Sequence, residues 1–112
     1  MTEAPQSEKT TVERNDARSR YEISVDDVLA GFTEFTVDTH GRLVFPHTEI
    51  DPAFGGRGLA GTLVREAMTD VSSRGETVVP VCRFVQKFLR ENEIAGLNVE
   101  WRDQEKTAEP RP

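Results

Sequence analysis

Between residues 21 and 50, apolar and polar residues alternate with a period of two, which is the pattern of half-buried β-strands. Three such runs occupy residues 21–25, 29–37 and 43–50. The connections between them are short, and the second one contains a turn around Gly41. Three strands joined so closely predict an antiparallel meander.

After residue 58 the period lengthens to three or four residues, which predicts a helix with one buried face. Its apolar positions are Leu59, Leu63, Val64, Ala67, Met68 and Val71. Gly75 then follows as a C-cap signature, and residues 77–81 form a short apolar run typical of a buried strand. Residues 83–90 predict a second amphipathic helix, and residues 94–101 are a candidate for a last short strand. The residues expected to face inward in the second helix are Phe84, Val85, Phe88 and Leu89.

The element order is therefore β-β-β-α-β-α, with a final strand as an option. The strands on either side of the first helix form a βαβ unit, so we expect them to be parallel. The fold class that follows is α+β with a mixed sheet.

Both ends of the chain lack the apolar residues that a core needs. Residues 1–19 contain the initiating Met, two Ala and one Val as their only apolar residues, and residues 103–112 are similarly polar. Such segments bury too little surface to offset their chain entropy. We therefore expect disordered tails at 1–19 and 103–112 and one folded domain at 20–102.

Composition narrows the class of protein. A chain of 112 residues with 36% apolar and 30% charged residues is typical of one soluble domain. It has no apolar run near the roughly 20 residues of a transmembrane helix, and its start lacks the features of a secretory signal. The single cysteine, Cys82, excludes an internal disulfide framework and a cysteine-rich zinc site, so we expect a cytoplasmic protein without a metal. The net charge of −6 argues against nucleic acid or an anionic membrane as a partner.

Four glycines lie close together around the start of the first helix, at positions 55, 56, 58 and 61. Their entropic cost is tolerated where a backbone must approach another group closely. At a helix start, the free N–H groups and the positive end of the helix dipole form an anion site. The loop therefore indicates either a phosphate ligand or a turn that only allows tight packing of helix on strand, and taken alone it favours neither.

Two common phosphate-binding motifs fit this loop poorly. Gly56, Gly58 and Gly61 match the dinucleotide fingerprint G-x-G-x-x-G, with Glu76 twenty residues beyond the first of them. However, five residues separate the strand from Gly56, and the chain has room for one βαβ unit where a dinucleotide fold needs several. A P-loop is excluded because no lysine precedes Thr62.

A third motif fits better. The segment 55–60 resembles the Q/R-x-x-G-x-G/A loop of the GNAT acetyltransferase superfamily, whose backbone amides hold the pyrophosphate of acetyl-CoA. Gly58 and Ala60 match the two small positions, while Gly55 stands where the superfamily has Gln or Arg. The element order is also that of a GNAT core counted from its second strand. The resemblance implies a GNAT-type acyl-CoA N-acyltransferase fold with acetyl-CoA as the acyl donor.

Three motifs in order narrow the resemblance to minimal single-domain GNAT-like N-acetyltransferases. They are His47-Thr48-Glu49-Ile50, Gly56-Arg57-Gly58-Leu59-Ala60, and Val78-Val79-Pro80-Val81-Cys82 with Phe84-Val85. The match covers residues 21–94, and Arg83 stands where those proteins have Pro. It implies that the strand before the loop, and the loop itself, hold the donor. The implied donor-binding residues are Thr48, Glu49, Ile50, Gly55, Gly56, Arg57, Gly58, Leu59, Ala60, Gly61 and Thr62.

The same resemblance implies two catalytic candidates, Cys82 and His47. His47 shares the alternating register of Leu43, Phe45 and Glu49, so it is either a buried structural residue or a general base, a role that suits the unperturbed histidine pKa of about 6.5. Cys82 lies at the carboxyl end of a strand, where ligands of α/β sheets bind, although cysteine is often simply a small buried residue. As a site residue it would either accept the acetyl group, with His47 as base, or form a wall of the donor site.

Arg83, Lys87 and Arg90 form a basic stripe on the second helix, which is either a solvated face or a contact for the nucleotide end of CoA. The leading hypothesis is an acetyl-CoA-dependent N-acetyltransferase acting on an unidentified amine. The second hypothesis is a CoA-binding module without turnover, and the third is a dinucleotide-binding fragment. The sequence specifies neither the acceptor nor the oligomeric state, and the negative net charge mildly favours a cationic acceptor.

Overall fold

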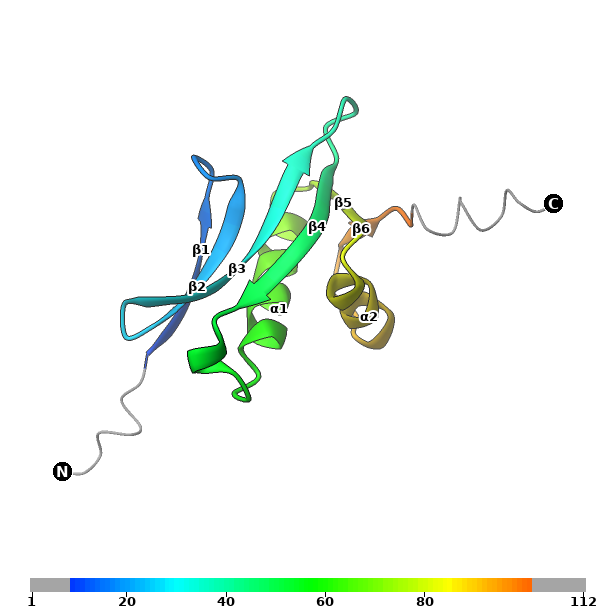
Figure 1. The fold of residues 1–112 in the computed structure, drawn as a ribbon. Helices are drawn as coiled ribbons and strands as arrows, with labels where there is room; N and C mark the ends of the chain where they lie inside the picture. The colour runs from blue at the N-terminus through cyan, green and yellow to red at the C-terminus, as the bar shows by residue number, and fades with distance from the viewer. Residues whose placement is uncertain (1–8, 102–112) are drawn as a thin grey trace.

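One six-stranded sheet forms the framework of the fold, and the computed structural model describes it within residues 9–101 (Figure 1). Residues 1–8 and 102–112, which include the predicted C-terminal tail, lie outside the described part. The strands are β1 (Thr10–Asn15), β2 (Arg20–Val25), β3 (Val28–Val37), β4 (Leu43–Ile50), β5 (Thr77–Pro80) and β6 (Asn98–Val99). The helices are α1 (Leu59–Ser73) and α2 (Arg83–Glu91), and a 3-10 turn, η2 (Pro52–Phe54), precedes α1.

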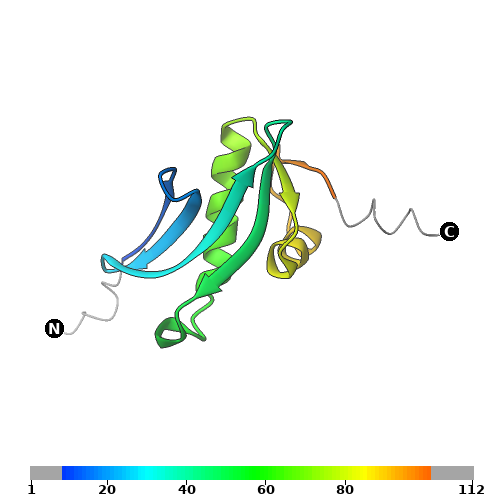
Figure 2. The ribbon, with the colours of Figure 1, turned by 45° about the horizontal axis from the view of Figure 1, so that its top comes forward.

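The strands lie in space in the order in which they occur along the chain. β1 to β4 pair antiparallel, whereas β4 with β5 and β5 with β6 pair in parallel. Figure 2 shows β4 and β5 pointing toward the same end of the molecule. The predicted meander, the parallel βαβ unit and the mixed α+β sheet are therefore confirmed.

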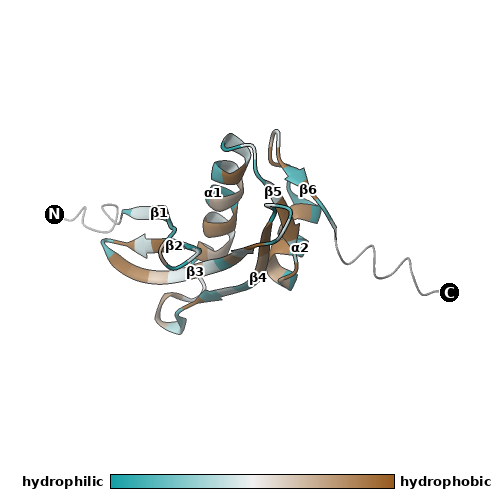
Figure 3. Cartoon of the chain, turned by 90° about the horizontal axis from the view of Figure 1, so that it is seen from above, coloured by the Kyte–Doolittle hydropathy of each residue, from teal (hydrophilic) through white to brown (hydrophobic). Residues whose placement is uncertain are grey.

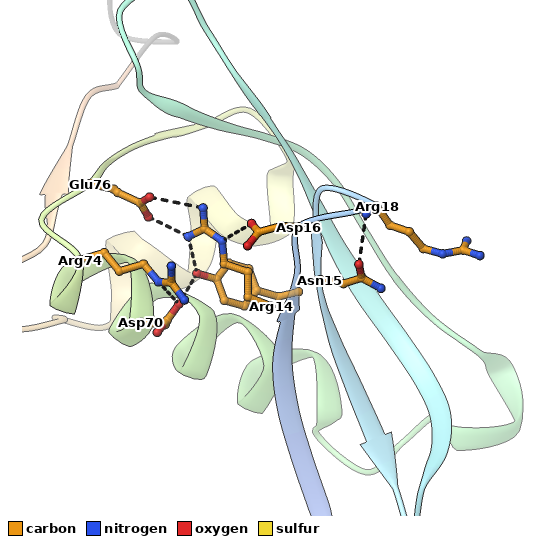
Figure 4. Close-up of polar contacts among 8 residues, drawn as sticks. Arg14, Asn15, Asp16, Arg18, Asp70, Arg74 and Glu76 are labelled. Carbon is orange, nitrogen blue, oxygen red and sulfur yellow. Dashed lines mark hydrogen bonds and ion pairs between the residues drawn. The ribbon is translucent and has the colours of Figure 1, made fainter.

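Strand β1 lies within the segment that we expected to be disordered, so that prediction is wrong for residues 10–15. β1 pairs with β2 along its whole length, and Val12 packs against the core. The Arg14 guanidinium lies over the ring of Phe35, 4.9 Å from its centroid, and forms an ion pair with Glu76 (Figure 4). A strand ladder and a long-range ion pair order this polar segment, and a count of apolar residues detects neither.

Helix α1 has the buried face that its apolar spacing predicts. The buried residues are Leu59, Leu63, Val64, Ala67, Met68 and Val71. The helix ends at Ser73, and Gly75 adopts a φ of 71°, a left-handed conformation that favours glycine. Its N–H donates to the carbonyl of Ser72 at 3.0 Å, so the predicted C-cap is confirmed.

The core lies between α1 and one side of the curved sheet, as the view from above shows (Figure 3). Its aromatic centre consists of Tyr21, Phe35 and Phe45, with ring centroids 5.6 to 6.4 Å apart. We call the side of the sheet on which these rings lie the α1 face, and the opposite side the outer face.

Helix α2 packs against α1, β4 and β5. Val85 and Phe88 are buried and Leu89 is partly buried, as predicted. Phe84 is 38% exposed, so its predicted inward orientation is wrong, whereas Val85 in the same first turn of α2 is buried. Gln86 is buried instead and donates from Nε2 to the carbonyl of Pro80 at 3.2 Å. The candidate last strand is present as β6, two residues long.

A β-bulge interrupts β4 at its centre. The β3–β4 register shifts by one residue at this point, so that Phe45 and Pro46 together oppose Phe35. Pro46 has no N–H to donate to a strand ladder, and bulges are among the few places in a sheet that tolerate proline.

The bulge reverses the alternation of the residues that follow it. Thr48 lies on the α1 face, opposite Thr33. His47 and Glu49 lie on the outer face, where 52% and 58% of their side chains are exposed. The prediction that His47 shares a face with Phe45 is wrong, because a one-residue shift moves every later side chain to the other face.

Candidate functional site

Strands β4 and β5 separate halfway along β4. Their parallel pairing ends where Phe45 meets Pro80. The carbonyl of Phe45 then accepts two hydrogen bonds, from the N–H of Val81 at 3.1 Å and from the N–H of Cys82 at 2.8 Å. Beyond this point β4 continues beside β3, while the segment that follows β5 turns into α2. Within residues 9–101 no strand pairs with the remaining edge of residues 47–50, which leaves backbone groups available there.

The beginnings of both helices lie at this same end of the parallel strands. α1 follows β4 and α2 follows β5, so both helix N-termini lie at the carboxyl ends of the strands (Figure 1). In open α/β sheets this end is where ligands bind. The fold therefore brings the second half of β4, the glycine loop and Cys82 to one end of the sheet.

The glycine loop is a preformed turn. Asp51 Oδ1 accepts a hydrogen bond from the N–H of Ala53 at 2.9 Å and thereby caps η2. Gly56 and Gly58 adopt φ values of 78° and 75°, which strongly favour glycine. Gly58 is the N-cap of α1 and has no side chain to cap it. The first amides of α1 therefore have no acceptor within the helix and point, with the positive end of the helix dipole, out of the loop.

The glycines of this loop are open to the outside. A Cβ atom added at Gly56, Gly58 or Gly61 would meet no other heavy atom within 4 Å. Tight packing of helix on strand therefore does not explain these three positions. Backbone conformation accounts for Gly56 and Gly58, but Gly61 lies inside the first turn of α1 and needs no positive φ. What remains is a surface that a ligand can approach to backbone distance.

Two side chains of the loop have defined positions. The Arg57 guanidinium carbon lies 5.4 Å from the ring centroid of Phe54, which itself packs against the core. A cation–π contact of this kind holds the guanidinium beside the ring. Thr62, implied by the resemblance as a donor-binding residue, donates from its hydroxyl to the carbonyl of Gly58 at 3.4 Å. In this structure the Thr62 hydroxyl thus stabilises the helix start.

Cys82 lies at the N-cap of α2 and is half-buried. Its thiol donates to Thr48 Oγ1 at 3.6 Å, and Thr48 Oγ1 is 2.8 Å from Thr33 Oγ1. Thr33 is fully buried and was missed as a site residue. The available signal was a polar residue at a buried position of the β3 alternation, between Gly31 and Phe35. The structure thus joins Cys82 to Thr48 on the α1 face.

His47 has different neighbours. Its Nε2 lies 3.0 Å from Glu49 Oε1, and its ring centroid lies 6.1 Å from that of Phe32 on the outer face. Within residues 9–101, no hydrogen bond or ion pair joins the His47 side chain to Cys82. The two predicted catalytic candidates therefore occupy opposite faces of β4. Glu49 pairs with His47 through its side chain.

The basic stripe of α2 is mostly engaged with neighbouring side chains. Lys87 pairs with Glu91 at 3.3 Å, and the Arg90 guanidinium carbon lies 5.0 Å from the ring centroid of Trp101. These contacts agree with a solvated helix face.

A polar network at the far end of α1 was also missed (Figure 4). The Tyr21 hydroxyl donates to Asp70 Oδ2 at 2.6 Å and accepts a bond from Arg14, while Arg74 also pairs with Asp70. Burial and the bond to Asp70 raise the pKa of Tyr21. Burial would raise the pKa of Asp70, but the bonds from Tyr21 and Arg74 outweigh it and lower that pKa. These residues line a groove of about 510 Å³ and come from three elements that only the fold brings together.

The described residues were searched for a metal-binding group and for a membrane-spanning helix. Within residues 9–101, no three His, Cys, Asp or Glu side chains gather in a way that could hold a metal ion. Neither helix in that range is long and apolar enough to cross a membrane.

Comparison with known proteins bears on the region that contains the site. A family model described as GCN5-related N-acetyl-transferase matches residues 20–96. The match extends from β2 past the end of α2 and includes the bulge, the glycine loop and Cys82, while β1 lies before it. A search of curated proteins found no match.

Proposed function

The chain belongs to the GCN5-related N-acetyltransferase family, and from this membership we propose that it transfers an acetyl group from acetyl-CoA to an amine. The family generally uses acetyl-CoA as donor and an amine as acceptor. The observation that carries the proposal for this chain is the open glycine loop, where a methyl group added at Gly56, Gly58 or Gly61 would contact nothing within 4 Å. Such a loop at a helix start suits a pyrophosphate.

The donor would lie across three neighbouring parts of the fold. The amides of residues 56–62 would hold the pyrophosphate, with Arg57 beside it. The unpaired edge of β4, residues 48–50, would offer backbone groups to the pantetheine arm. This path ends where β4 and β5 separate, next to the half-buried Cys82.

Direct transfer needs only a held donor and a neutral amine. The amine nitrogen attacks the thioester carbonyl, a C–N bond forms and the C–S bond breaks. The proton lost by nitrogen ends on the sulfur of CoA. Cys82 then serves as a wall of the donor site.

A two-step transfer uses Cys82 as the first acceptor. Its Sγ attacks the carbonyl, its proton passes to the departing CoA sulfur, and an acetyl thioester forms on Cys82. The amine then cleaves this thioester, and a proton returns to Sγ.

The position of His47 suits a base for the acceptor amine better than a base for the Cys82 thiol. His47 lies on the outer face with Glu49, while Cys82 contacts Thr48 on the α1 face. We therefore assign His47, oriented by Glu49, the role of deprotonating an amine that approaches from the outer face. In this assignment His47 does not deprotonate the Cys82 thiol.

The separation of His47 from Cys82 also favours a second candidate function, a CoA-binding module without turnover. By contrast, the dinucleotide hypothesis has lost support. η2 and Gly55 stand between β4 and Gly56, whereas that motif needs a tight turn from strand to helix.

Thermal unfolding with acetyl-CoA, CoA and NAD tests the proposal. A ligand that binds only the folded chain raises its Tm, so acetyl-CoA should stabilise and NAD should not. Stabilisation by NAD alone would refute the proposal. To separate an enzyme from a binding module, polyamines and lysine peptides are screened as acceptors, and the release of free CoA thiol from acetyl-CoA is measured. If acetyl-CoA binds but no tested amine causes release of the CoA thiol, the result supports the second candidate.

Intact mass after incubation with acetyl-CoA separates the two versions of transfer. An added acetyl group on the wild type that is absent from Cys82→Ala supports the two-step version. Turnover without that species, or with an equal one on Cys82→Ala, supports direct transfer.

A further inference from the structure

Three side chains from different strands form a line of hydrogen-bonding groups beside the proposed donor site. Thr33 lies on β3, Thr48 lies opposite it on β4, and Cys82 follows β5. The two threonine oxygens are 2.8 Å apart, and Cys82 Sγ lies 3.6 Å from Thr48 Oγ1. The line exists because the bulge at Pro46 turns Thr48 toward the α1 face.

The hydroxyl of Thr33 is costly for the fold unless it is bonded. Its residue is 0% exposed, and valine would fill the same volume without a polar group. Its side chain has one hydrogen-bond partner in the described structure, Thr48. A buried hydroxyl satisfies its hydrogen by donating it, and Thr48 Oγ1 is in position to accept.

The direction of the outer bond depends on the state of the sulfur. A neutral thiol donates to Thr48 Oγ1, whereas a thiolate can only accept. Hydroxyl hydrogens rotate, so Thr48 can turn its own hydrogen toward Sγ. Thr48 Oγ1 then still accepts from Thr33. The line therefore accommodates the thiolate with every hydroxyl hydrogen in a bond.

We propose that Thr33 and Thr48 are positioning residues for Cys82, with Thr48 donating to its thiolate and Thr33 orienting the Thr48 hydroxyl. The inference deepens the proposed function and rests on it for the place of Cys82 beside the donor. The effect on the sulfur itself, however, does not require acetyl-CoA. It can therefore be measured without a substrate.

The test uses iodoacetamide, which alkylates thiolates, and intact mass to follow Cys82, the single cysteine of the chain. In Thr48→Val we expect the alkylation rate at pH 7.5 to fall about fivefold, because the thiolate that reacts loses the hydroxyl that donates to it. In Thr33→Val we expect a fall of about twofold, since Thr48 keeps its hydroxyl but loses its orientation. Thr48→Ser and Thr33→Ser restore the hydroxyl and should stay near the wild-type rate.

Thr36→Val is the matched control. Thr36 lies on the same strand as Thr33 but is exposed and pairs with Val44, before the bulge. Its substitution should leave the alkylation rate unchanged. A wild-type rate in Thr48→Val, or an equal loss in Thr48→Val and Thr48→Ser, would overturn the inference. If Thr48→Val fails to fold, Thr33→Val against Thr33→Ser decides in the same way.

The two proposals fail differently. If the threonine variants change alkylation as expected but acetyl-CoA neither binds nor reacts, the proposed function fails and the role of the threonines stands. If acetyl-CoA binds and the amine is acetylated while Thr48→Val alkylates like wild type, the inference fails and the function stands.

Discussion

Arg14 and Glu76 are 62 positions apart in the chain, yet the guanidinium of one binds the carboxylate of the other through two contacts, Nη1–Oε1 at 2.8 Å and Nη2–Oε2 at 3.3 Å. Their side chains are 11% and 25% exposed, so solvent screens the pair only in part. The hydrogen bond with Glu76 raises the pKa of Arg14 further above its ordinary value, although burial opposes this. The pair fastens β1 to the turn between α1 and β5.

Loss of this pair should destabilise the chain measurably. We expect Glu76→Gln to lower the free energy of unfolding by about 1–3 kcal/mol, because among residues 9–101 it leaves the largely buried guanidinium with Asp16 as its one direct ion-pair partner. Urea denaturation measures the loss, and faster proteolysis within β1 should accompany it. Glu91→Gln is the control, since its pair with Lys87 is exposed and should change stability by less than about 0.5 kcal/mol. Equal effects of the two variants would show that the long-range pair has no special role.

Tyr21 should make stability depend on pH in the alkaline range. Burial, with the bond to Asp70, raises its pKa above the ordinary 10.0, so the folded state holds the phenol proton more tightly than the unfolded state does. That contribution is complete below about pH 10 and is lost as the pH rises through the folded-state pKa. We expect Tyr21→Phe to be less stable than wild type at pH 8, with a smaller difference at pH 11. Urea midpoints at the two pH values measure this, and a constant difference would contradict it.

Gly58 and Gly41 offer a matched pair of variants for testing whether the glycine loop binds the donor. Both have positive φ, 75° and 77°, and neither has a neighbour that a methyl group would meet within 4 Å. Alanine should therefore cost each about 1 kcal/mol of stability, for the same backbone reason. Only Gly58→Ala should also weaken acetyl-CoA binding, by about tenfold, because it disturbs amides at the start of α1. Calorimetric titration measures both affinities. Equal affinities would remove the loop from the donor site.

Gly31 and Gly61 should respond to alanine with opposite signs. A Cβ atom at Gly31 would lie 2.4 Å from the backbone oxygen of Glu49, so β3 and β4 would have to move apart. We expect Gly31→Ala to lower the free energy of unfolding by about 2–4 kcal/mol. Gly61 lies within α1 with open space around it, so Gly61→Ala should raise stability by about 0.5–1 kcal/mol. A wild-type denaturation midpoint for Gly31→Ala would contradict the close approach of the two strands.

Much of the fold was predictable because the forces that form it act locally. The spacing of Leu59, Leu63 and Val71 identified the buried face of α1, and Gly75 marked its end. The order of the elements and the three motifs also led to the family that the comparison then matched. β1 was missed because Arg14 is ordered by partners on β2 and beyond α1, which no local pattern reveals.

The candidate site was predicted in outline and corrected in detail. The glycine loop and Cys82 lie at one end of the sheet, as the motifs implied. The sequence suggested His47 as the base for Cys82, whereas the structure places Thr48 beside Cys82 and His47 beside Glu49. A single extra residue in β4 exchanges the faces of His47 and Thr48, and the position of Pro46 in the sequence did not by itself locate that bulge.

By itself, the sequence determined most of the succession of strands and helices, the place of the glycine loop before α1 and the family, because periodicity and motif spacing are properties of neighbouring residues. Only the tertiary structure decided that β1 is ordered, that His47 faces outward with Glu49, and that Thr33 and Thr48 reach Cys82. These relationships depend on strand register and on contacts between distant segments. Register is set by the packing of the whole sheet against α1, where one inserted residue reverses every side chain that follows.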